Sequence, residues 1–167
     1  GIRFESQIVG GVIPKEFIPA IEQGIRRAAK QGVVAGYPVV DVEVILLDGS
    51  YHERDSSGFA FELAGGAAFK AALEQAQPCL LEPMMNVEVI TPVDYVGACI
   101  GDLTRRRAMI NDQQMRGQAM MISADVPLQD MFGYIAQLRA LSSGRASFSM
   151  QFAYYQSVPN QRLKTIV

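Results

Sequence analysis

The chain has 167 residues, of which 49% are hydrophobic and 19% are charged, and its formal net charge is −2. This length suggests one or two small domains, and the apolar content suffices for a packed core, so disorder is not expected. Residues 1–82 hold 7 Lys/Arg against 11 Asp/Glu, and residues 83–167 hold 8 against 6. Strong RNA binding by general phosphate neutralisation is therefore not expected, and any RNA contact must be local.

The lack of a signal pattern and the spacing of the cysteines predict a cytoplasmic protein with no membrane partner. No apolar run approaches the ~18 residues that span a bilayer, and the chain opens on Arg3-Phe4-Glu5 without a signal pattern. Cys79 and Cys99 form neither a disulfide framework nor a CxxC site. Their apolar neighbours predict reduced thiols in the core, as in cytosolic proteins.

A domain boundary is predicted near Leu81-Glu82-Pro83, because Pro83 disfavours helix at the preceding residue and cannot donate to a strand ladder. The expected domains are 1–82 and 83–167.

Apolar periodicity in the first domain predicts the order strand, helix, strand, helix. Gly32 is the expected C-cap of the first helix, and Asp55 or Ser56 is the expected N-cap of the second helix. The predicted ranges are 4–9, 17–29, 40–46 (largely buried) and 56–77.

The second helix of this first domain contains the pair Gly65-Gly66. Each glycine costs a helix ~1 kcal/mol relative to alanine. The pair therefore predicts a close backbone approach, which we expect to be against the sheet.

The second domain predicts the order β-α-β-β-α-β, the ferredoxin-like split βαβ arrangement with both helices on one sheet face. Thr91-Pro92 is a helix-start signal with Thr91 as N-cap, and Pro127 is expected to open the second helix. Ser143-Gly144 closes that helix, and the last strand has an edge-compatible alternation. The strands are expected at 85–90, 108–113, 119–125 and 148–154.

Catalytic motifs are missing from the sequence. The run from Gly10 to Lys15 lacks the GxxxxGK[ST] pattern of a P-loop, and His52 is the only histidine, so no His-based metal set can form. Ser50, His52 and Asp55 lie within one loop, whereas a triad needs groups that converge from separate elements. No enzymatic activity and no cofactor site are predicted.

The run from Asp48 to Asp55 joins a strand to a helix, so it projects from a rigid base. One interpretation is an ordinary solvated loop. The other is a probe tip formed by Asp48, Gly49, Ser50, Tyr51, His52 and Glu53, in which Tyr51 and His52 stack or hydrogen-bond against nucleotides.

Arg105, Arg106 and Arg107 close the first helix of the second domain. They are either charges favoured by the helix dipole and left in water, or a contact to ribosomal RNA phosphates. Tyr154-Tyr155 is expected to pack on its strand rather than to form a stacking platform.

Several ungapped motifs resemble the C-terminal domains of elongation factor G, in the same order and over nearly the whole chain. The domain IV motifs are Ile8 to Glu16, Ala35 to Val42, and Asp48 to Glu53 with Asp55-Ser56-Ser57. The domain V motifs are Leu80 to Pro83, Ile100 to Leu103, Arg106-Arg107, Val126-Pro127-Leu128 and Met131 to Tyr134.

The resemblance implies an α+β chain: part of a ribosomal protein S5 domain 2-like domain IV (β-α-β-α), then a ferredoxin-like domain V. Domain IV of this family enters the decoding region of the small ribosomal subunit, where its tip contacts tRNA–mRNA during translocation. Asp48 to Glu53 matches one tip loop, and His52 matches the position that archaeal and eukaryotic counterparts convert to diphthamide. Domain V docks near the large-subunit stalk base and the sarcin–ricin loop. GTP and Mg belong to a GTPase domain that this chain lacks, so no cofactor is expected here.

Some residues depart from the family pattern and leave alternatives open. Ala108 stands where Gly is common, Gly66 where Ser is common, and Ala153-Tyr154 replaces Asp-His. A divergent paralogue could act in ribosome recycling or ribosome protection, and a free-standing ferredoxin-like ligand-binding module is a third reading. An incomplete domain IV sheet would expose a strand edge, with a risk of dimerisation.

Overall fold

The computed structural model describes residues 1–159 and residue 162. The described residues form two compact units that divide between Cys79 and Leu80. We call residues 1–79 the N-terminal unit and residues 80–159 the C-terminal unit. The second domain expected from the sequence extends to residue 167, and its residues 160, 161 and 163–167 lie outside the described part.

Pro83 lies inside a strand rather than at the division between the units. It is opposite Tyr155 of one neighbouring strand, whereas pairing with the other neighbour begins only at Met84. Pro83 therefore has a strand on one side only, a position at which a missing N–H is tolerated.

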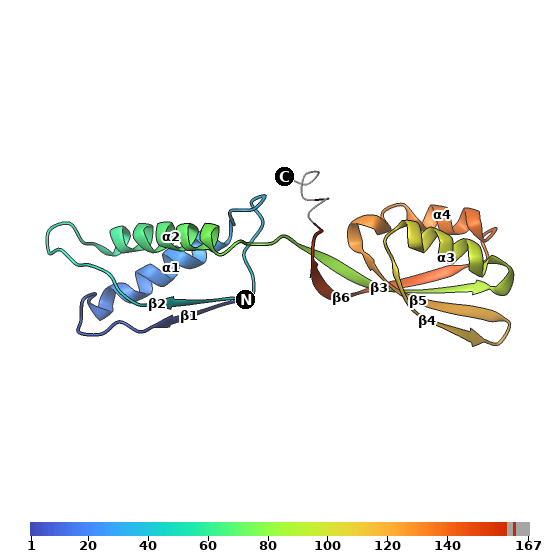
Figure 1. The fold of residues 1–167 in the computed structure, drawn as a ribbon, viewed down its shortest axis with the longest axis horizontal. Coiled ribbons are helices and arrows are strands. Elements are labelled where there is room, and N and C mark those ends of the chain that lie inside the picture. Colours follow the sequence, from blue (N-terminus) through green and yellow to red (C-terminus); the bar gives the residue numbers. More distant parts are fainter. Residues whose placement is uncertain (160–161, 163–167) are drawn as a thin grey trace. The chain divides into compact units, whose positions relative to one another are not determined.

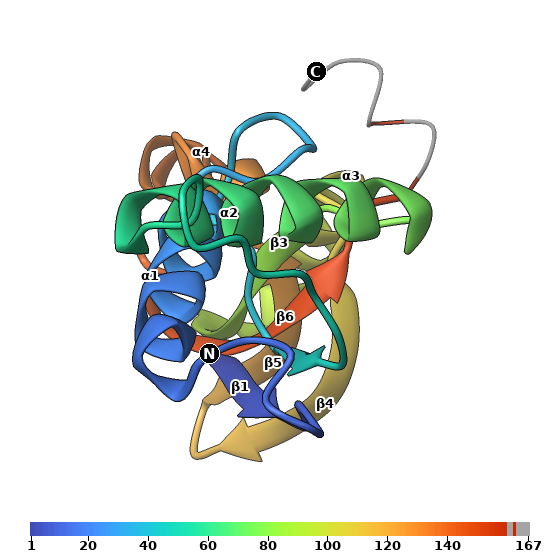
Figure 2. The same ribbon diagram turned by 90° about the vertical axis from the view of Figure 1, so that its left-hand side faces the viewer.

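The N-terminal unit consists of β1 (Ile2–Ser6), α1 (Ile18–Ala29), β2 (Val42–Leu46) and α2 (Gly58–Gln75). The expected order β-α-β-α is confirmed. The two strands are parallel, with β1 in register from Ile2 opposite Val42 to Ser6 opposite Leu46. Both helices lie on the same side of this sheet (Figures 1 and 2). The carboxyl ends of β1 and β2 consequently meet at one edge, from which both connecting loops leave.

The core of the N-terminal unit lies between the helices and the sheet. Helical spacing of apolar residues brings one face of α1 into it. The buried members are Ile13, Ile21, Ile25, Ala29, Phe61, Phe69 and Leu73.

Glycines let α1 and α2 approach closely. A Cβ on Gly24 would overlap the Glu62 carbonyl oxygen, and a Cβ on Gly65 would lie 2.8 Å from the Ile21 carbonyl oxygen. A Cβ on Gly66 would lie 3.1 Å from the Gly24 carbonyl oxygen. The predicted close approach is confirmed, but its expected partner was wrong: these glycines pack on α1, because the two helices lie side by side over one sheet.

Two capping residues and the burial of one strand in this unit differ from the sequence expectation. The N-cap of α2 is Ser57, whose hydroxyl accepts from the Ala60 N–H at 3.1 Å, rather than Asp55 or Ser56. The C-cap of α1 is Lys30 rather than Gly32. β2 is half-buried rather than largely buried, because helices cover only one of its faces and leave Ile45 exposed.

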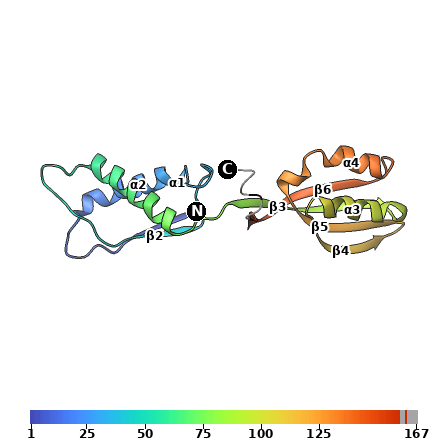
Figure 3. The same cartoon turned by 45° about the horizontal axis from the view of Figure 1, so that its top comes forward.

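The C-terminal unit contains β3 (Leu81–Pro92), α3 (Val96–Arg105), β4 (Met109–Arg116), β5 (Ala119–Pro127), α4 (Tyr134–Leu141) and β6 (Ser147–Ser157). Its antiparallel sheet has the order β4-β5-β3-β6 (Figure 3). Both helices lie on one face of the sheet (Figure 1). The predicted split βαβ arrangement is confirmed.

The core of the C-terminal unit lies between the helices and one sheet face. β3 and β5 are the central strands, so their alternate residues are fully covered. The buried members are Val87, Val89, Cys99, Leu103, Ile122, Ala124, Val126, Met131, Tyr134 and Leu138.

Both helices of this unit begin later than the sequence predicts. Thr91 is a buried residue at the end of β3 and not an N-cap, and α3 begins at Val96 after a 3₁₀ turn. Pro127 ends β5, and a 3₁₀ turn precedes α4. In each case the strand continues through the proline that was expected to open the helix, so the helix begins further along the chain.

The two cysteines have different environments. Cys99 is buried, whereas Cys79 is exposed, so the prediction of two core thiols was wrong for Cys79. Cys79 is the last residue of the N-terminal unit before the division and belongs to neither buried cluster. Burial raises the pKa of the Cys99 thiol, and the Asp102 carboxylate adds to this rise.

Candidate functional site

The loop from Leu47 to Ser57 leaves the carboxyl end of β2 and leads into α2. The six predicted tip residues lie in it, and all six are exposed. The structure therefore brings them together in one segment at the surface, and none of them is buried.

The base of this loop is braced on the core. A Cβ on Gly49 would collide with the side chain of Ile13, a buried residue of the preceding loop. The backbone N–H of Gly49 also donates to the Asp48 carboxylate at 2.7 Å. Asp48-Gly49 is thus held by a local hydrogen bond and by a close approach to Ile13, whose side chain an added Cβ would displace.

The far side of the loop is closed around Ser56. The Ser56 hydroxyl accepts from the backbone N–H of His52 at 2.9 Å. The His52 carbonyl accepts from the N–H groups of Ser56 at 2.9 Å and Asp55 at 3.2 Å. The backbone of His52 is therefore held by three hydrogen bonds, while the residue remains exposed.

Tyr51 differs from His52 because one face of its ring is already occupied. It stacks on Phe17 with ring centroids 5.8 Å apart, and Phe17 in turn stacks on Phe61 at 4.8 Å. Tyr51 is 39% exposed. The ring anchors the loop to the aromatic core and leaves only its other face and its hydroxyl for a partner.

The loop from Gln7 to Pro14 lies beside the predicted tip, and the sequence reasoning did not assign it to the site. The contact between Gly49 and Ile13 joins the two loops, as the parallel pairing of β1 and β2 requires. Val9 is 80% exposed, and Gly10 and Gly11 have φ of 72° and 68°. Two consecutive glycines between a predicted strand and a predicted helix were the signal in the sequence that could have identified it.

The charges at the tip do not favour phosphate. Asp48, Glu53 and Asp55 are exposed, and Arg54 is the single cation of the run from Asp48 to Asp55. A contact to nucleic acid at this loop would therefore depend on stacking, hydrogen bonds and shape rather than on neutralised phosphates.

Arg106, in the C-terminal unit, is held by intramolecular contacts. Its guanidinium donates to the Asp102 carboxylate at 2.8 Å and to the Asp130 carbonyl at 2.6 Å. It also lies 5.0 Å from the centroid of the Tyr134 ring. These contacts tie the end of α3 to the turn that precedes α4.

Arg107 is also paired within the chain. It donates to the Glu82 carboxylate at 2.6 Å and to the Asp130 carboxylate at 3.3 Å, and the hydrogen bond with Glu82 raises the pKa of Arg107. Arg105 is exposed. Of the three arginines, Arg105 is therefore the one whose position leaves its guanidinium open to a phosphate, whereas Arg106 and Arg107 stabilise the fold.

The tyrosines of β6 lie on different sides. The Tyr154 hydroxyl donates to the Asp125 carboxylate at 3.3 Å across the sheet face without helices, whereas Tyr155 contacts Phe152 with centroids 5.1 Å apart. Both keep exposed ring surface. The prediction that they pack on their own strand agrees with the contact of Tyr155, whereas the Tyr154 hydroxyl reaches Asp125 on β5.

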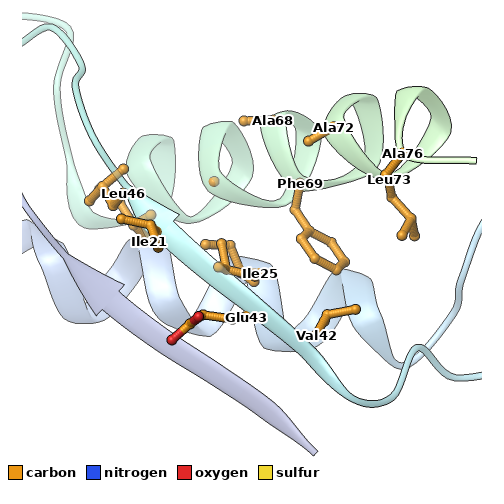
Figure 4. A pocket seen from close by; sticks show the side chains of 13 residues that line it. Ile21, Ile25, Val42, Glu43, Leu46, Ala68, Phe69, Ala72, Leu73 and Ala76 are labelled. Atoms are coloured by element: carbon orange, nitrogen blue, oxygen red, sulfur yellow. The ribbon is translucent and has the colours of Figure 1, made fainter. Parts of the chain in front are cut away.

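An apolar pocket of about 360 Å³ lies between β2, α1 and α2 (Figure 4). Ile21, Ile25, Phe69 and Leu73 contribute to its walls. The one carboxylate among its lining residues, Glu43, forms an ion pair with Arg3 at 3.3 Å. The lining offers apolar surface without the convergent polar groups that a reaction needs.

Residues 1–159 and 162 contain neither a candidate metal site nor a candidate membrane span. Among them, no cluster of three or more His, Cys, Asp or Glu side chains is arranged to hold a metal ion. No helix in the same described part combines the length and apolar character needed to cross a bilayer.

Comparison with known proteins gives two family matches in chain order. Residues 1–77 match the family described as elongation factor G, domain IV, and residues 79–166 match the elongation factor G C-terminus. The chain thus consists of two domains of a translation factor. It belongs to the elongation factor G family and corresponds to its C-terminal part.

Individual relatives agree with this assignment. The chain is 57% identical to elongation factor G 2 of Hahella chejuensis and 55% identical to elongation factor G of Rhodopseudomonas palustris, over 95% of the chain in each case. A crystal structure of a Thermus thermophilus protein superposes with a TM-score of 0.89 at 40% identity, covering 99% of this chain and 25% of that one. The chain spans only 24% and 23% of the two sequence relatives.

Proposed function

We propose that this chain is the ribosome-facing C-terminal part of a translocase, whose tip loop enters the decoding region and supports GTP-dependent movement of tRNA–mRNA. The observation that carries the proposal is His52, an exposed residue whose backbone is held by three hydrogen bonds on a loop braced against Ile13. A rigid loop with an exposed imidazole can enter a confined RNA site without a large ordering cost. Membership of the elongation factor G family supports this role.

The proposed mechanism is mechanical. GTP hydrolysis with Mg takes place in a GTPase domain of the parent protein, and the present domains transmit the resulting motion. The tip then occupies the vacated A site and blocks return of the tRNA. The exposed acids of the loop favour contacts by shape and hydrogen bonding.

The C-terminal unit has a separate proposed contact. We place it near the large-subunit stalk base and the sarcin–ricin loop, with Arg105 as the candidate phosphate ligand, because Arg106 and Arg107 are paired internally. A ribosomal role also implies a cytoplasmic protein.

The test of the tip is His52→Ala in the full-length parent. If His52 stacks on or bonds to RNA, loss of about 1–3 kcal/mol per contact predicts that single-round translocation slows about fivefold or more. Lys70→Ala, an exposed change in α2, is the matched control and should leave the rate unchanged. Rates for His52→Ala within error of wild type would remove His52 from the mechanism.

Ribosome recycling or protection by a divergent paralogue is the alternative, supported by the substitutions at Ala108 and Ala153-Tyr154 relative to the family pattern. Subunit splitting and translocation measured side by side with the same full-length protein distinguish the two roles. A factor that splits subunits but does not translocate would favour the alternative.

A further inference from the structure

Two residues outside the predicted tip make contacts that fix its shape. Ser56 follows the tip residues Asp48 to Glu53 along the chain. Phe17 lies in the 3₁₀ turn Lys15–Phe17, which precedes α1. The connections from β1 to α1 and from β2 to α2 leave the same end of the N-terminal unit (Figure 1). Residues of both connections are therefore close enough to hold the tip.

Ser56 closes the chain from His52 to Ser56 into a single turn. Its hydroxyl accepts from the His52 N–H at 2.9 Å, and its own N–H donates to the His52 carbonyl at 2.9 Å. Ser56 is half-buried, whereas every other residue from Leu47 to Ser57 is exposed. The one side chain of this loop that turns inward is thus the one that contacts both backbone polar groups of His52.

The turn leads without a spacer into a capped helix. Ser57 is the N-cap of α2, and its hydroxyl accepts from the Ala60 N–H at 3.1 Å. The Ser57 carbonyl accepts from the Phe61 N–H at 3.0 Å. Because Ser56 and Ser57 are adjacent, the backbone of His52 is tied directly to the first turn of α2.

Phe17 holds the other side of His52 through an aromatic column. Its ring stacks on Tyr51 and on Phe61, with interplanar angles of 29° and 24°. Phe17 is half-buried and packs against the buried cluster of the N-terminal unit. Tyr51 directly precedes His52, so the column fixes the chain before His52, and Ser56 fixes it after His52.

We propose that Ser56 and Phe17 are positioning residues that hold His52 in place and affect translocation only through it. Ser56 acts by its hydrogen bonds to the His52 backbone, and Phe17 acts by holding Tyr51. This inference rests on the function proposed above, in which the exposed imidazole meets RNA. A loop that must be ordered on binding loses affinity, so contacts within the chain that order it beforehand favour the RNA contact.

A role limited to stability would give a different result. Phe17 packs on the core, so its replacement could destabilise the unit without moving the tip. A positioning role predicts instead that the effect of each change depends on His52. Residues that act as one unit are not additive, so the two classes are separated by combining each change with His52→Ala.

Single-round translocation by the full-length parent tests this dependence. We expect Ser56→Ala and Phe17→Leu each to slow translocation about twofold or more, as loss of one hydrogen bond or one stacked ring pair predicts. Either change combined with His52→Ala should be no slower than His52→Ala alone. Slowing that adds in the combined variants would contradict the proposal.

Conservative variants and a matched control accompany this test. Ser56→Thr keeps the hydroxyl and Phe17→Tyr keeps the ring, so both should recover most of the wild-type rate. Ser149→Ala removes a hydroxyl from an exposed serine of β6 and should leave the rate unchanged. Conservative variants as slow as Ser56→Ala and Phe17→Leu would contradict the assigned contacts.

Hydrogen exchange of the free full-length parent, read over residues 47–57, tests the anchors without the ribosome. Ser56→Ala and Phe17→Leu should each speed exchange of this segment about twofold or more, because each removes a contact that keeps the loop closed. Phe148→Leu is the control, since it removes the ring pair with Tyr134 in the C-terminal unit and should leave this segment unchanged.

The two measurements distinguish failure of this inference from failure of the proposed function. Unchanged exchange of residues 47–57 in both variants would overturn the positioning roles, while a slow His52→Ala would still support the ribosomal function. Faster exchange in both variants, with a wild-type translocation rate for His52→Ala, would support the two anchors and contradict the role of His52 in translocation.

Discussion

Arg107 has an unusual backbone conformation for an arginine and a nearly buried partner. Its φ is 63°, in the left-handed region, immediately after α3. Its side chain is 29% exposed, and the Glu82 side chain that it pairs with is 9% exposed. The residue ends the helix and at the same time neutralises a carboxylate that could not remain charged there alone.

We predict that Arg107→Ala lowers the free energy of unfolding of the C-terminal unit by about 2–4 kcal/mol, because it leaves Glu82 buried without its cation. The Glu82 carboxylate raises the pKa of Arg107, so this stabilisation is present below that pKa and is lost only as pH rises through it. The loss should therefore be similar at about pH 6 and pH 9, far below the range where arginine titrates. Urea unfolding at both pH values measures it.

Arg105→Ala is the matched control for this change. Arg105 is exposed in the last turn of α3, so its removal should shift stability by no more than about 0.5 kcal/mol. Equal effects of the two substitutions would contradict a structural role specific to Arg107.

At the scale of elements, the pairing of α1 with α2 depends on the absence of side chains. Gly24 and Gly65 lie where the helix backbones approach most closely, and the Ile21 side chain also packs against Gly65. Glycine lowers the stability of a helix, so the packing between α1 and α2 must stabilise the unit by more than this unfavourable helix propensity. The loops at the carboxyl ends of β1 and β2 lead into α1 and α2, so the packing of these helices helps to fix where the loops lie.

We predict that Gly24→Ala destabilises the N-terminal unit by about 1–3 kcal/mol, although alanine is the better helix former, because the new methyl group would overlap the Glu62 backbone. Gly101→Ala in α3 is the control, since nothing lies within 4 Å of its Cβ position. That change should be neutral or stabilising by up to about 1 kcal/mol. Thermal unfolding of both variants compares them, and a stabilised Gly24→Ala would show that the helices can separate without cost.

At the scale of the whole molecule, each unit has its own buried cluster. Phe69 and Leu73 belong to the first, and Leu103 and Tyr134 to the second. The division between Cys79 and Leu80 separates the two clusters along the chain. A change in one core should therefore be detected first in the amides of its own unit.

We predict that Leu103→Ala costs the C-terminal unit about 2–5 kcal/mol, because Leu103 is fully buried and its removal leaves a cavity. Hydrogen exchange read peptide by peptide should show faster exchange in residues 80–159, with residues 1–79 near their wild-type rates. Phe69→Ala is the reciprocal variant, with the effect expected in residues 1–79. Equal acceleration in both units after either change would show that the two cores unfold as one.

Local patterns in the sequence were sufficient for much of this protein. Alternation and helical spacing predicted the order of elements in both units, because these periods depend only on which side of an element faces the core. The run from Asp48 to Glu53 was predicted as one exposed loop because it contains a turn signal between a strand and a helix, and such connections lie at the surface. The family motifs were also readable without coordinates.

Contacts between distant residues were decided only by the tertiary structure. The pairing of Arg107 with Glu82 joins residues on different elements, and no local pattern distinguishes a paired arginine from a solvated one. The same holds for the stacking of Tyr51 on Phe17 and for Gly65 against α1. Sequence periodicity indicates which face of an element is buried, whereas the partner on that face depends on how the chain folds back in space.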